Sequence, residues 1–143
     1  MFIGEFQHTL DAKGRIFVPS KFRDDLGENF IITIGLDNCL FVFPQEEFDR
    51  LKAKIDALSI TNKDARTFSR FFFGHAGECE MDKQGRIMIP QNLRAFANLS
   101  KDVTVVGVSN RVELWDTAAW EDAHNFDKFS PEELAEKLGQ LGI

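Results

Sequence analysis

The stretch LDAKGRIFVPSKFR at residues 10–23 decides how this chain folds, because it returns as MDKQGRIMIPQNLR at residues 81–94. The Asp, Gly, Arg, Ile, Pro and final Arg keep their places at an offset of 71 residues, about half of the 143-residue chain. A repeat of this kind is typical of two structural modules related by pseudo-symmetry. We therefore expect that whatever one copy presents to a partner is presented again by the other.

Each copy begins with Asp-x-x-Gly-Arg, a pattern typical of a tight turn. Asp11 and Asp82 can accept hydrogen bonds from the backbone that follows them, and Gly14 and Gly85 can adopt a positive φ. A short apolar run of β-prone residues follows each turn and ends at a proline, which cannot continue a strand ladder. The pattern predicts a turn and a short strand in both copies, followed by a short helix.

The two halves remain alike beyond the repeat, at an offset of 72 residues. Residues 31–36 and 103–108 are rich in Ile, Val and Thr, and the Asp-Asn and Ser-Asn turns that follow connect each of them to another strand. Another strand precedes each Asp turn. We therefore expect two hairpins in each half of the chain.

Helical periodicity lies between and after these strands. It predicts helices over residues 48–58 and 62–73, and the capping box at residues 130–133 opens a terminal helix. The apolar stripes on these helices are interpreted as core-facing, with subunit contact as the alternative. They comprise Phe48, Leu51, Ile55 and Leu58, then Phe68, Phe71 and Phe72, and finally Leu134, Leu138 and Leu141.

The charge of the chain is unevenly distributed. The formal net charge is −6, which by itself argues against a nucleic-acid partner because phosphates repel acidic surfaces. Residues 11–23 carry a net charge of +3 and residues 82–94 carry +2, so the rest of the chain carries −11. The positive charge is therefore concentrated in the two repeated stretches.

Composition and apolar patterning indicate a soluble intracellular protein. Cys39 and Cys79 stand far apart without metal-like spacing, so we interpret them as reduced thiols in the core. The opening MFIGEF does not resemble a signal peptide, and the longest apolar runs, such as residues 30–36, are too short to span a bilayer. We expect no membrane partner.

The sequence lacks a recognisable catalytic constellation. His8, His75 and His124 share no ligand spacing, and the pair formed by His75 and Cys79 falls short of the four ligands of a structural zinc site. It has no phosphate-binding glycine loop, nucleophile elbow or Cys-x-x-Cys. We expect no enzymatic activity, cofactor, metal or small-molecule substrate, and a small metal-dependent enzyme using His75 and Cys79 is the alternative.

Arg15 and Arg86 require another explanation, because a β-turn needs no arginine after its glycine. One interpretation is an ion pair with the nearby Asp or with a neighbouring subunit. The other is contact with DNA or RNA, since the guanidinium fork matches phosphate and can read guanine in the major groove. The candidate DNA-binding residues are Lys13, Arg15, Lys21, Arg23, Lys83, Arg86 and Arg94.

These paired turns, each leading into an apolar strand and a proline, resemble the bacterial MraZ family when taken with the opening MFIGEF. The resemblance extends from the first residues to Trp120. It implies an α+β fold of two tandem swapped-hairpin modules of the SpoVT/AbrB type, which form one pseudo-symmetric β-barrel flanked by helices. The implied domains are a first module at 1–60, a connecting helix at 61–73, a second module at 74–124 and a C-terminal helix at 125–143.

The resemblance also implies a function. MraZ proteins are sequence-specific transcriptional regulators that assemble into rings and bind repeated sites in double-stranded DNA upstream of the cell-division and cell-wall gene cluster. The expected location is the cytoplasm, in association with the nucleoid. The family's Asp-x-x-x-Arg motif, implicated in DNA contact, falls on Asp11 and Arg15 and on Asp82 and Arg86. In the second copy Gln84 precedes the glycine and Lys83 lies one position earlier.

The alternative to a DNA-binding regulator is a structural or protein-interaction ring. In that case the basic turns would make salt bridges between subunits.

Overall fold

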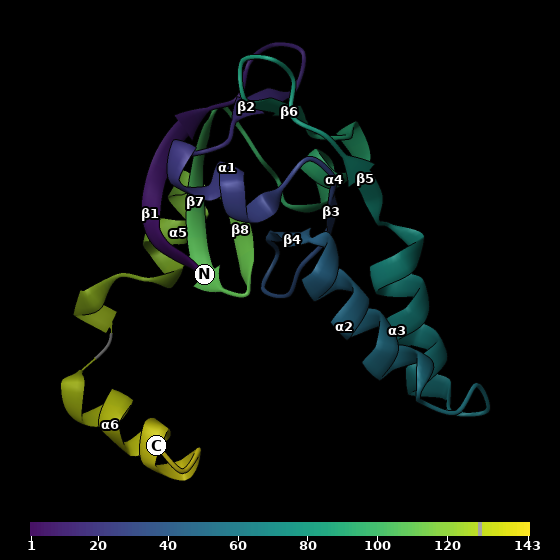
Figure 1. The fold of residues 1–143 in the computed structure, drawn as a ribbon. Helices are drawn as coiled ribbons and strands as arrows, with labels where there is room; N and C mark the ends of the chain where they lie inside the picture. Colours follow the sequence, from purple (N-terminus) through teal and green to yellow (C-terminus); the bar gives the residue numbers. More distant parts are fainter. Residues whose placement is uncertain (129) are drawn as a thin grey trace.

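A six-stranded antiparallel sheet forms the centre of the molecule (Figure 1). The computed structural model describes residues 1–128 and 130–143. The sheet has the order β1-β7-β8-β4-β3-β5, and β2 and β6 form a separate two-stranded ribbon. The strands are β1 Phe2–Thr9, β2 Arg15–Phe17, β3 Phe30–Ile34, β4 Leu40–Pro44, β5 Gly77–Cys79, β6 Arg86–Met88, β7 Asp102–Ser109 and β8 Arg111–Asp116. Strands from the two halves of the chain are therefore interleaved within one sheet, with β7 and β8 of the second half between β1 and β4 of the first half.

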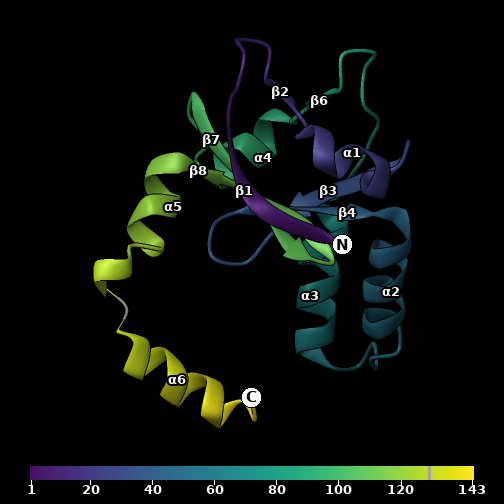
Figure 2. The same cartoon turned by 60° about the vertical axis from the view of Figure 1, so that its left-hand side comes forward.

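Helices follow the strands in both halves of the chain. They are α1 Ser20–Leu26, α2 Gln45–Asp56, α3 Lys63–Gly74, α4 Gln91–Phe96, α5 Thr117–Ala123, the 3-10 helix η1 Phe126–Lys128 and α6 Pro131–Gln140. The Asn62 side chain caps α3 by accepting hydrogen bonds from two backbone N–H groups, and the Ser130 hydroxyl caps α6. Helices α2 and α3 lie side by side as a hairpin, whereas α6 extends away from the body (Figures 1 and 2). In the ranges that the structure describes, no helix has the length and apolar content needed to cross a membrane.

The two halves of the chain exchange strands. β1 pairs with β7 of the second half, and β5 pairs with β3 of the first half. The strands that flank each Asp turn therefore pair across the halves and not with each other, so the predicted first hairpin of each half is wrong. The predicted second hairpins are confirmed as β3–β4 and β7–β8.

A pseudo-twofold axis relates the halves. Ile16 in β2 lies opposite Ile87 in β6, and these two residues hold the same position in the repeat. Phe41 in β4 likewise lies opposite Glu113 in β8, at the offset of 72 residues. Two equivalent residues face each other only where a twofold axis passes between them. The axis thus runs through the centre of the ribbon and the centre of the sheet.

The closed barrel implied by the family resemblance is not observed, because within residues 1–128 and 130–143 neither sheet closes on itself. β1 and β5 remain the edges of the large sheet. Pro19 and Pro90 stop the ribbon strands after a few residues. The last ribbon hydrogen bonds, from Val18 N to Gly85 O and from Ile89 N to Gly14 O, both at 2.9 Å, tie the ribbon to the two turns instead of to a sheet edge.

Apolar residues form a core on each face of the sheet. The first core joins the ribbon, α1 and α4 to one face and includes Ile16, Ile87, Phe22, Leu93, Phe30 and Val103. The second lies mainly under α2, α3 and α5 and includes Phe41, Phe43, Phe48, Phe72 and Trp115. The cysteine interpretation is confirmed: both thiols are free, Cys39 is buried and Cys79 packs against the first core. Burial raises the pKa of Cys39 to about 12 and that of Cys79 to about 11.

The core-facing interpretation of the helical stripes is only partly right. Phe48, Ile55 and Phe72 are buried. Leu58 and Phe68 are exposed, and the α6 stripe of Leu134, Leu138 and Leu141 is exposed throughout. The core-facing interpretation is therefore wrong for α6.

Replacing the axial Ile87 by alanine is expected to lower the free energy of unfolding by about 2–5 kcal/mol, because the cavity would lie where both halves meet. The side chain of Ile87 is only 3% exposed, whereas that of the adjacent Met88 is 51% exposed. Met88→Ala is therefore the matched control, with an expected change below about 0.5 kcal/mol. Urea unfolding measures both, and equal losses would contradict the axial packing described above.

Candidate nucleic-acid interface

The two Asp-Gly-Arg turns project from the same end of the molecule, opposite the α2–α3 hairpin and α6 (Figures 1 and 2). The ribbon of β2 and β6 begins directly after them and holds them next to each other. Turns supported by paired strands and a packed core are positioned more rigidly than free loops. This end of the molecule therefore presents two similar surfaces at a fixed separation.

The first turn is organised by the carboxylate of Asp11. Its Oδ1 accepts hydrogen bonds from the backbone N–H of Lys13 at 2.9 Å and of Arg15 at 2.8 Å, and its Oδ2 accepts one from Arg15 Nε at 2.7 Å. Gly14 has a φ of +83°, a conformation that strains residues with a Cβ. The backbone hydrogen bond from Arg15 is the largest of the interactions that lower the pKa of Asp11.

The second turn repeats this arrangement around Asp82. Its Oδ1 accepts from the backbone N–H groups of Gln84 and Arg86, both at 2.9 Å, and its Oδ2 accepts from Arg86 Nε at 2.8 Å. Gly85 has a φ of +82°. Again the backbone hydrogen bond from Arg86 contributes most to lowering the pKa of Asp82. The interpretation of Asp and Gly as turn-forming residues is confirmed in both copies.

Each arginine pairs with the aspartate of its own turn. The structure therefore contains the ion pair with the nearby Asp that was considered from the sequence. The pair occupies only Nε, and the terminal nitrogens of Arg15 and Arg86 have no hydrogen-bond partner among the residues that the structure describes. Their side chains are 30% and 20% exposed. Arg86 also lies over the ring of Phe17, with Cζ 5.9 Å from its centroid. The Asp carboxylate therefore orients each guanidinium without using its outer donors.

The final arginine of each repeat supports the turn of the other half. The guanidinium of Arg23 in α1 packs so closely on Gly85 that a Cβ there would lie 2.4 Å from Arg23 Cζ. Arg94 in α4 packs on Gly14 in the same way, at 2.7 Å from such a Cβ. Arg23 Nε also donates to Val18 O at 2.9 Å. The structure thus puts Arg23 and Arg94 behind the turns, in contacts that the sequence interpretation missed.

The remaining candidate cations lie on the surface. Lys13 and Lys83 are exposed on the two turns, and Lys21 is exposed on α1. Gln84 is exposed where the first copy has Lys13, so the two tips differ in charge distribution. Both repeats preserve the glycine and the final arginine, and this is the sequence signal that could have pointed to the contact between Arg23 or Arg94 and the turn of the other half. The sequence alone does not show that these residues meet, because the fold brings them together.

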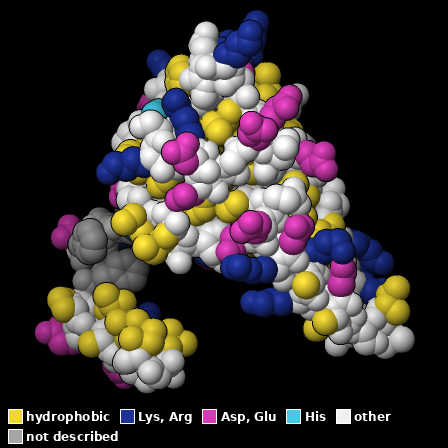
Figure 3. All heavy atoms as spheres, in the orientation of Figure 1, with side chains coloured by type: hydrophobic (Ala, Val, Ile, Leu, Met, Phe, Trp, Pro, Cys, Tyr) yellow, Lys and Arg dark blue, Asp and Glu magenta, His cyan; other side chains and the backbone are white. Residues whose placement is uncertain are grey.

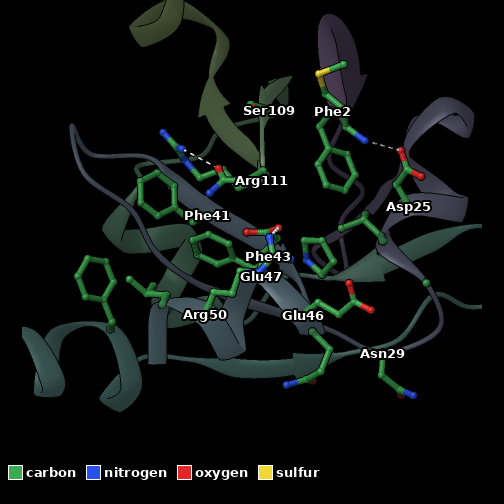
Figure 4. A pocket seen from close by; sticks show the side chains of 18 of the residues that line it. Phe2, Asp25, Asn29, Phe41, Phe43, Glu46, Glu47, Arg50, Ser109 and Arg111 are labelled. Carbon is green, nitrogen blue, oxygen red and sulfur yellow. Dashed lines mark hydrogen bonds and ion pairs between the residues drawn. The ribbon is translucent and has the colours of Figure 1, made fainter. Parts of the chain in front are cut away.

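The rest of the described structure offers no comparable site. No three His, Cys, Asp or Glu side chains gather as a metal would require within the described ranges. His75 Nδ1 lies 2.9 Å from Phe71 O. A groove of about 1190 Å³ beside α2 is lined by groups of both charges, including Glu46, Arg50 and Arg111 (Figure 4). It lies away from the turns and contains no nucleophile paired with a base.

Comparison with known proteins reveals similarity over the whole chain. The model of the family described as "MraZ protein, putative antitoxin-like" matches residues 1–71 and again residues 72–140. A protein of Acetivibrio thermocellus named transcriptional regulator MraZ is 57% identical over 143 residues, which covers all of both chains. Proteins of the same name from Thermoanaerobacter sp. (strain X514) and Clostridium tetani are 54% and 52% identical, again over all of both chains.

The contact between Arg23 and Gly85 predicts an unequal response to two glycine substitutions. Gly27 also has a positive φ, +76° with ψ −167°, in a region essentially restricted to glycine, but no atom lies within 4 Å of the place that a Cβ would take there. Gly27→Ala is therefore expected to cost only the backbone strain, about 1–3 kcal/mol. Gly85→Ala adds a clash with Arg23 to its own strain and is expected to cost more in unfolding experiments, because such overpacking alone costs about 1–3 kcal/mol. Adding Arg23→Ala should recover part of that difference, and strictly additive losses would contradict the contact.

The lowered pKa values of Asp11 and Asp82 predict a loss of stability in acid. A carboxyl whose pKa is lowered by folding contributes stability above its ordinary value of 3.8, and this contribution is lost as the pH falls through the folded-state pKa. The double variant Asp11→Asn with Asp82→Asn keeps an oxygen acceptor but loses the charge. Between about pH 6 and about pH 3 its melting temperature should fall less than that of the wild type. An equal fall in both proteins would contradict the role of these two carboxylates.

Proposed function

The chain belongs to the MraZ family, and on this basis we propose that it is a sequence-specific DNA-binding transcriptional regulator without catalytic activity. We further propose that it acts in the cytoplasm, in association with the nucleoid, as a ring-shaped homo-oligomer. Its targets would be repeated sites in double-stranded DNA upstream of the cell-division and cell-wall gene cluster. The curated relatives named transcriptional regulator MraZ support the regulatory part of this proposal.

The observation that carries the proposal is the duplicated, oriented arginine. In both turns a carboxylate holds Nε at 2.7–2.8 Å, which fixes the plane of the guanidinium. The outer donors of Arg15 and Arg86 then suit a bidentate partner, either a phosphate or the O6 and N7 edge of guanine. Pre-orientation reduces the entropy that binding would otherwise cost.

The candidate cations divide by their surroundings. We assign Lys13, Lys21 and Lys83 to phosphate contacts, because exposed ammonium groups provide sequence-independent attraction. Arg15 and Arg86 are assigned to oriented contacts with the DNA. Arg23 and Arg94 belong to the interface as supports of the opposite turns, with any DNA contact secondary. The interface therefore combines residues from both halves of the chain.

The acidic remainder of the chain favours one orientation on DNA. With +5 in the two repeated stretches and −11 elsewhere, the end that carries the turns attracts phosphates, whereas the rest of the chain on balance repels them. A single pair of turns offers few phosphate contacts, and a ring would present several pairs to repeated sites at once. Once one pair of turns is bound, the effective concentration of the next pair at its DNA site is raised. Contacts that are weak singly can therefore give a high overall affinity.

The second candidate, a structural ring joined by its basic turns, has less support. Arg15 and Arg86 already have carboxylate partners inside their own turns. A salt bridge to a neighbouring subunit would need a further carboxylate at each turn, in addition to the one with which each arginine is already paired. The DNA interpretation needs no change in the existing ion pairs.

The double variant Arg15→Ala with Arg86→Ala is expected to lose DNA affinity by about 30-fold or more, because each oriented arginine contact contributes about 1–3 kcal/mol. DNA selected from a random pool serves as the probe in fluorescence anisotropy titrations over a range of salt. Each lost phosphate contact should also lower the salt slope by about one unit.

The matched control is Arg50→Ala with Lys54→Ala, which removes two cations from α2 at the other end of the molecule. Size-exclusion chromatography accompanies both titrations. Unchanged affinity in the Arg15 and Arg86 variant would overturn the site, and loss of assembly before loss of DNA binding would favour the structural ring.

A further inference from the structure

The two halves of the molecule differ most in their last helix. Each matched segment extends into a second helix after its strands, which is α3 in the first half and α6 in the second. Helix α3 folds back onto the body: the rings of Phe73 and Phe48 lie 5.8 Å apart, and Thr33 Oγ1 donates to Phe72 O at 2.6 Å. Helix α6 does not, and all of its residues from Pro131 to Gln140 are exposed.

The α6 helix nevertheless has an apolar face. Leu134, Leu138 and Leu141 recur at helical spacing and are 51%, 37% and 76% exposed. An isolated helix of ten residues is marginal in water, since most helical stability in proteins comes from packing. The counterpart helix α3 meets this need by packing on α2. The leucine face of α6 is therefore suited to cover an equivalent apolar surface.

A surface of this kind lies at the far end of the α2–α3 hairpin. A groove of about 380 Å³ is lined there by apolar and basic side chains, chiefly Ile55, Leu58, Ile60, Ala65, Arg66 and Arg70. Ile60 is 81% exposed and Leu58 is 51% exposed. Within the part of the chain that the structure describes, no segment covers this apolar groove.

The charges of the helix and the groove are complementary. Helix α6 carries Glu132, Glu133 and Glu136 against the single cation Lys137. The groove has Arg66 and Arg70 against the single acid Asp56. Figure 3 shows dark blue side chains around the α2–α3 hairpin and a yellow face on α6, which form two separate projections from the body. A basic, apolar groove fits an acidic helix with a leucine face.

We propose that α6 of one copy docks in the α2–α3 groove of a second copy. The helix and the groove are different surfaces, so the contact is head-to-tail and leaves one free groove at one end of the assembly and one free helix at the other until a ring closes. This inference rests on the proposed ring and names the surfaces that form it. The turns lie at the opposite end of the molecule and stay uncovered.

The variant Leu138→Asp tests the helix side of the contact. It adds a charge to the centre of the leucine face and is expected to reduce the mass measured by light scattering from that of the oligomer to that of one chain. Since every residue of α6 is exposed in its own chain, circular dichroism and thermal unfolding of the body should not change. The matched control Gln140→Asp adds the same charge to α6 outside the leucine face and should leave the oligomer intact.

Mixing two variants tests the direction of the contact. Ile60→Asp is expected to disable the groove and to give single chains as well. A mixture of the Leu138→Asp and Ile60→Asp chains retains one working helix and one working groove, so it should form a dimer and nothing larger. An absence of dimers in the mixture would overturn the head-to-tail contact, as would an oligomer formed by Ile60→Asp alone.

DNA binding distinguishes this inference from the proposed function. Single-chain Leu138→Asp keeps both turns, so it should bind one DNA site but lose the additional affinity for repeated sites. If Leu138→Asp stays oligomeric while Arg15→Ala with Arg86→Ala loses DNA binding, the docking inference fails and the proposed site stands. A monomeric wild type would overturn the ring and the docking together, and leave the DNA site to its own test.

Discussion

The antiparallel pairing of β2 with β6 is the interaction on which the rest of the structure depends. It brings Ile16 opposite Ile87 and so defines the pseudo-twofold axis. Because each ribbon strand is only three residues long, it cannot stabilise itself and must be supported by the core beneath it. That core draws on both halves, so neither half has a complete interior without the other. The exchange of β1 and β5 between the halves follows from the same axis.

The ribbon also makes the turns interdependent. It carries each glycine to the arginine at the end of the other repeat, so Arg23 meets Gly85 and Arg94 meets Gly14. A substitution at the arginine of one half therefore affects the turn of the other half. The outward arginines are in turn oriented by carboxylates that also accept the turn's own N–H groups. Folding of the turn and orientation of the proposed DNA contact are consequently a single event.

Local chemistry could be predicted from the sequence, and long-range pairing could not. The Asp and Gly roles, the proline breaks and the helix expected at residues 62–73 correspond closely to the structure, where α3 spans Lys63–Gly74. The partners of β1 could not be predicted, because alternation identifies a strand without saying which strand lies beside it. The support of Gly85 by Arg23 was hidden for the same reason. The leucines of α6 indicated a helix with an apolar face, but periodicity does not tell what covers that face. DNA contact by the seven candidate residues stays a prediction.

The break in symmetry at α6 has a consequence for assembly. If α6 folded onto α5 as α3 folds onto α2, the two halves would be alike and no free leucine face would remain for a second copy. The exposed helix and the groove are unlike surfaces, and contacts between unlike surfaces can continue from copy to copy. The symmetric part of the molecule suits two equivalent turns on DNA, and the asymmetric part suits an assembly of many copies. Because the turns and α6 lie at opposite ends of the body, the proposed assembly would leave the turns uncovered, and each added copy would bring two more turns to the same DNA.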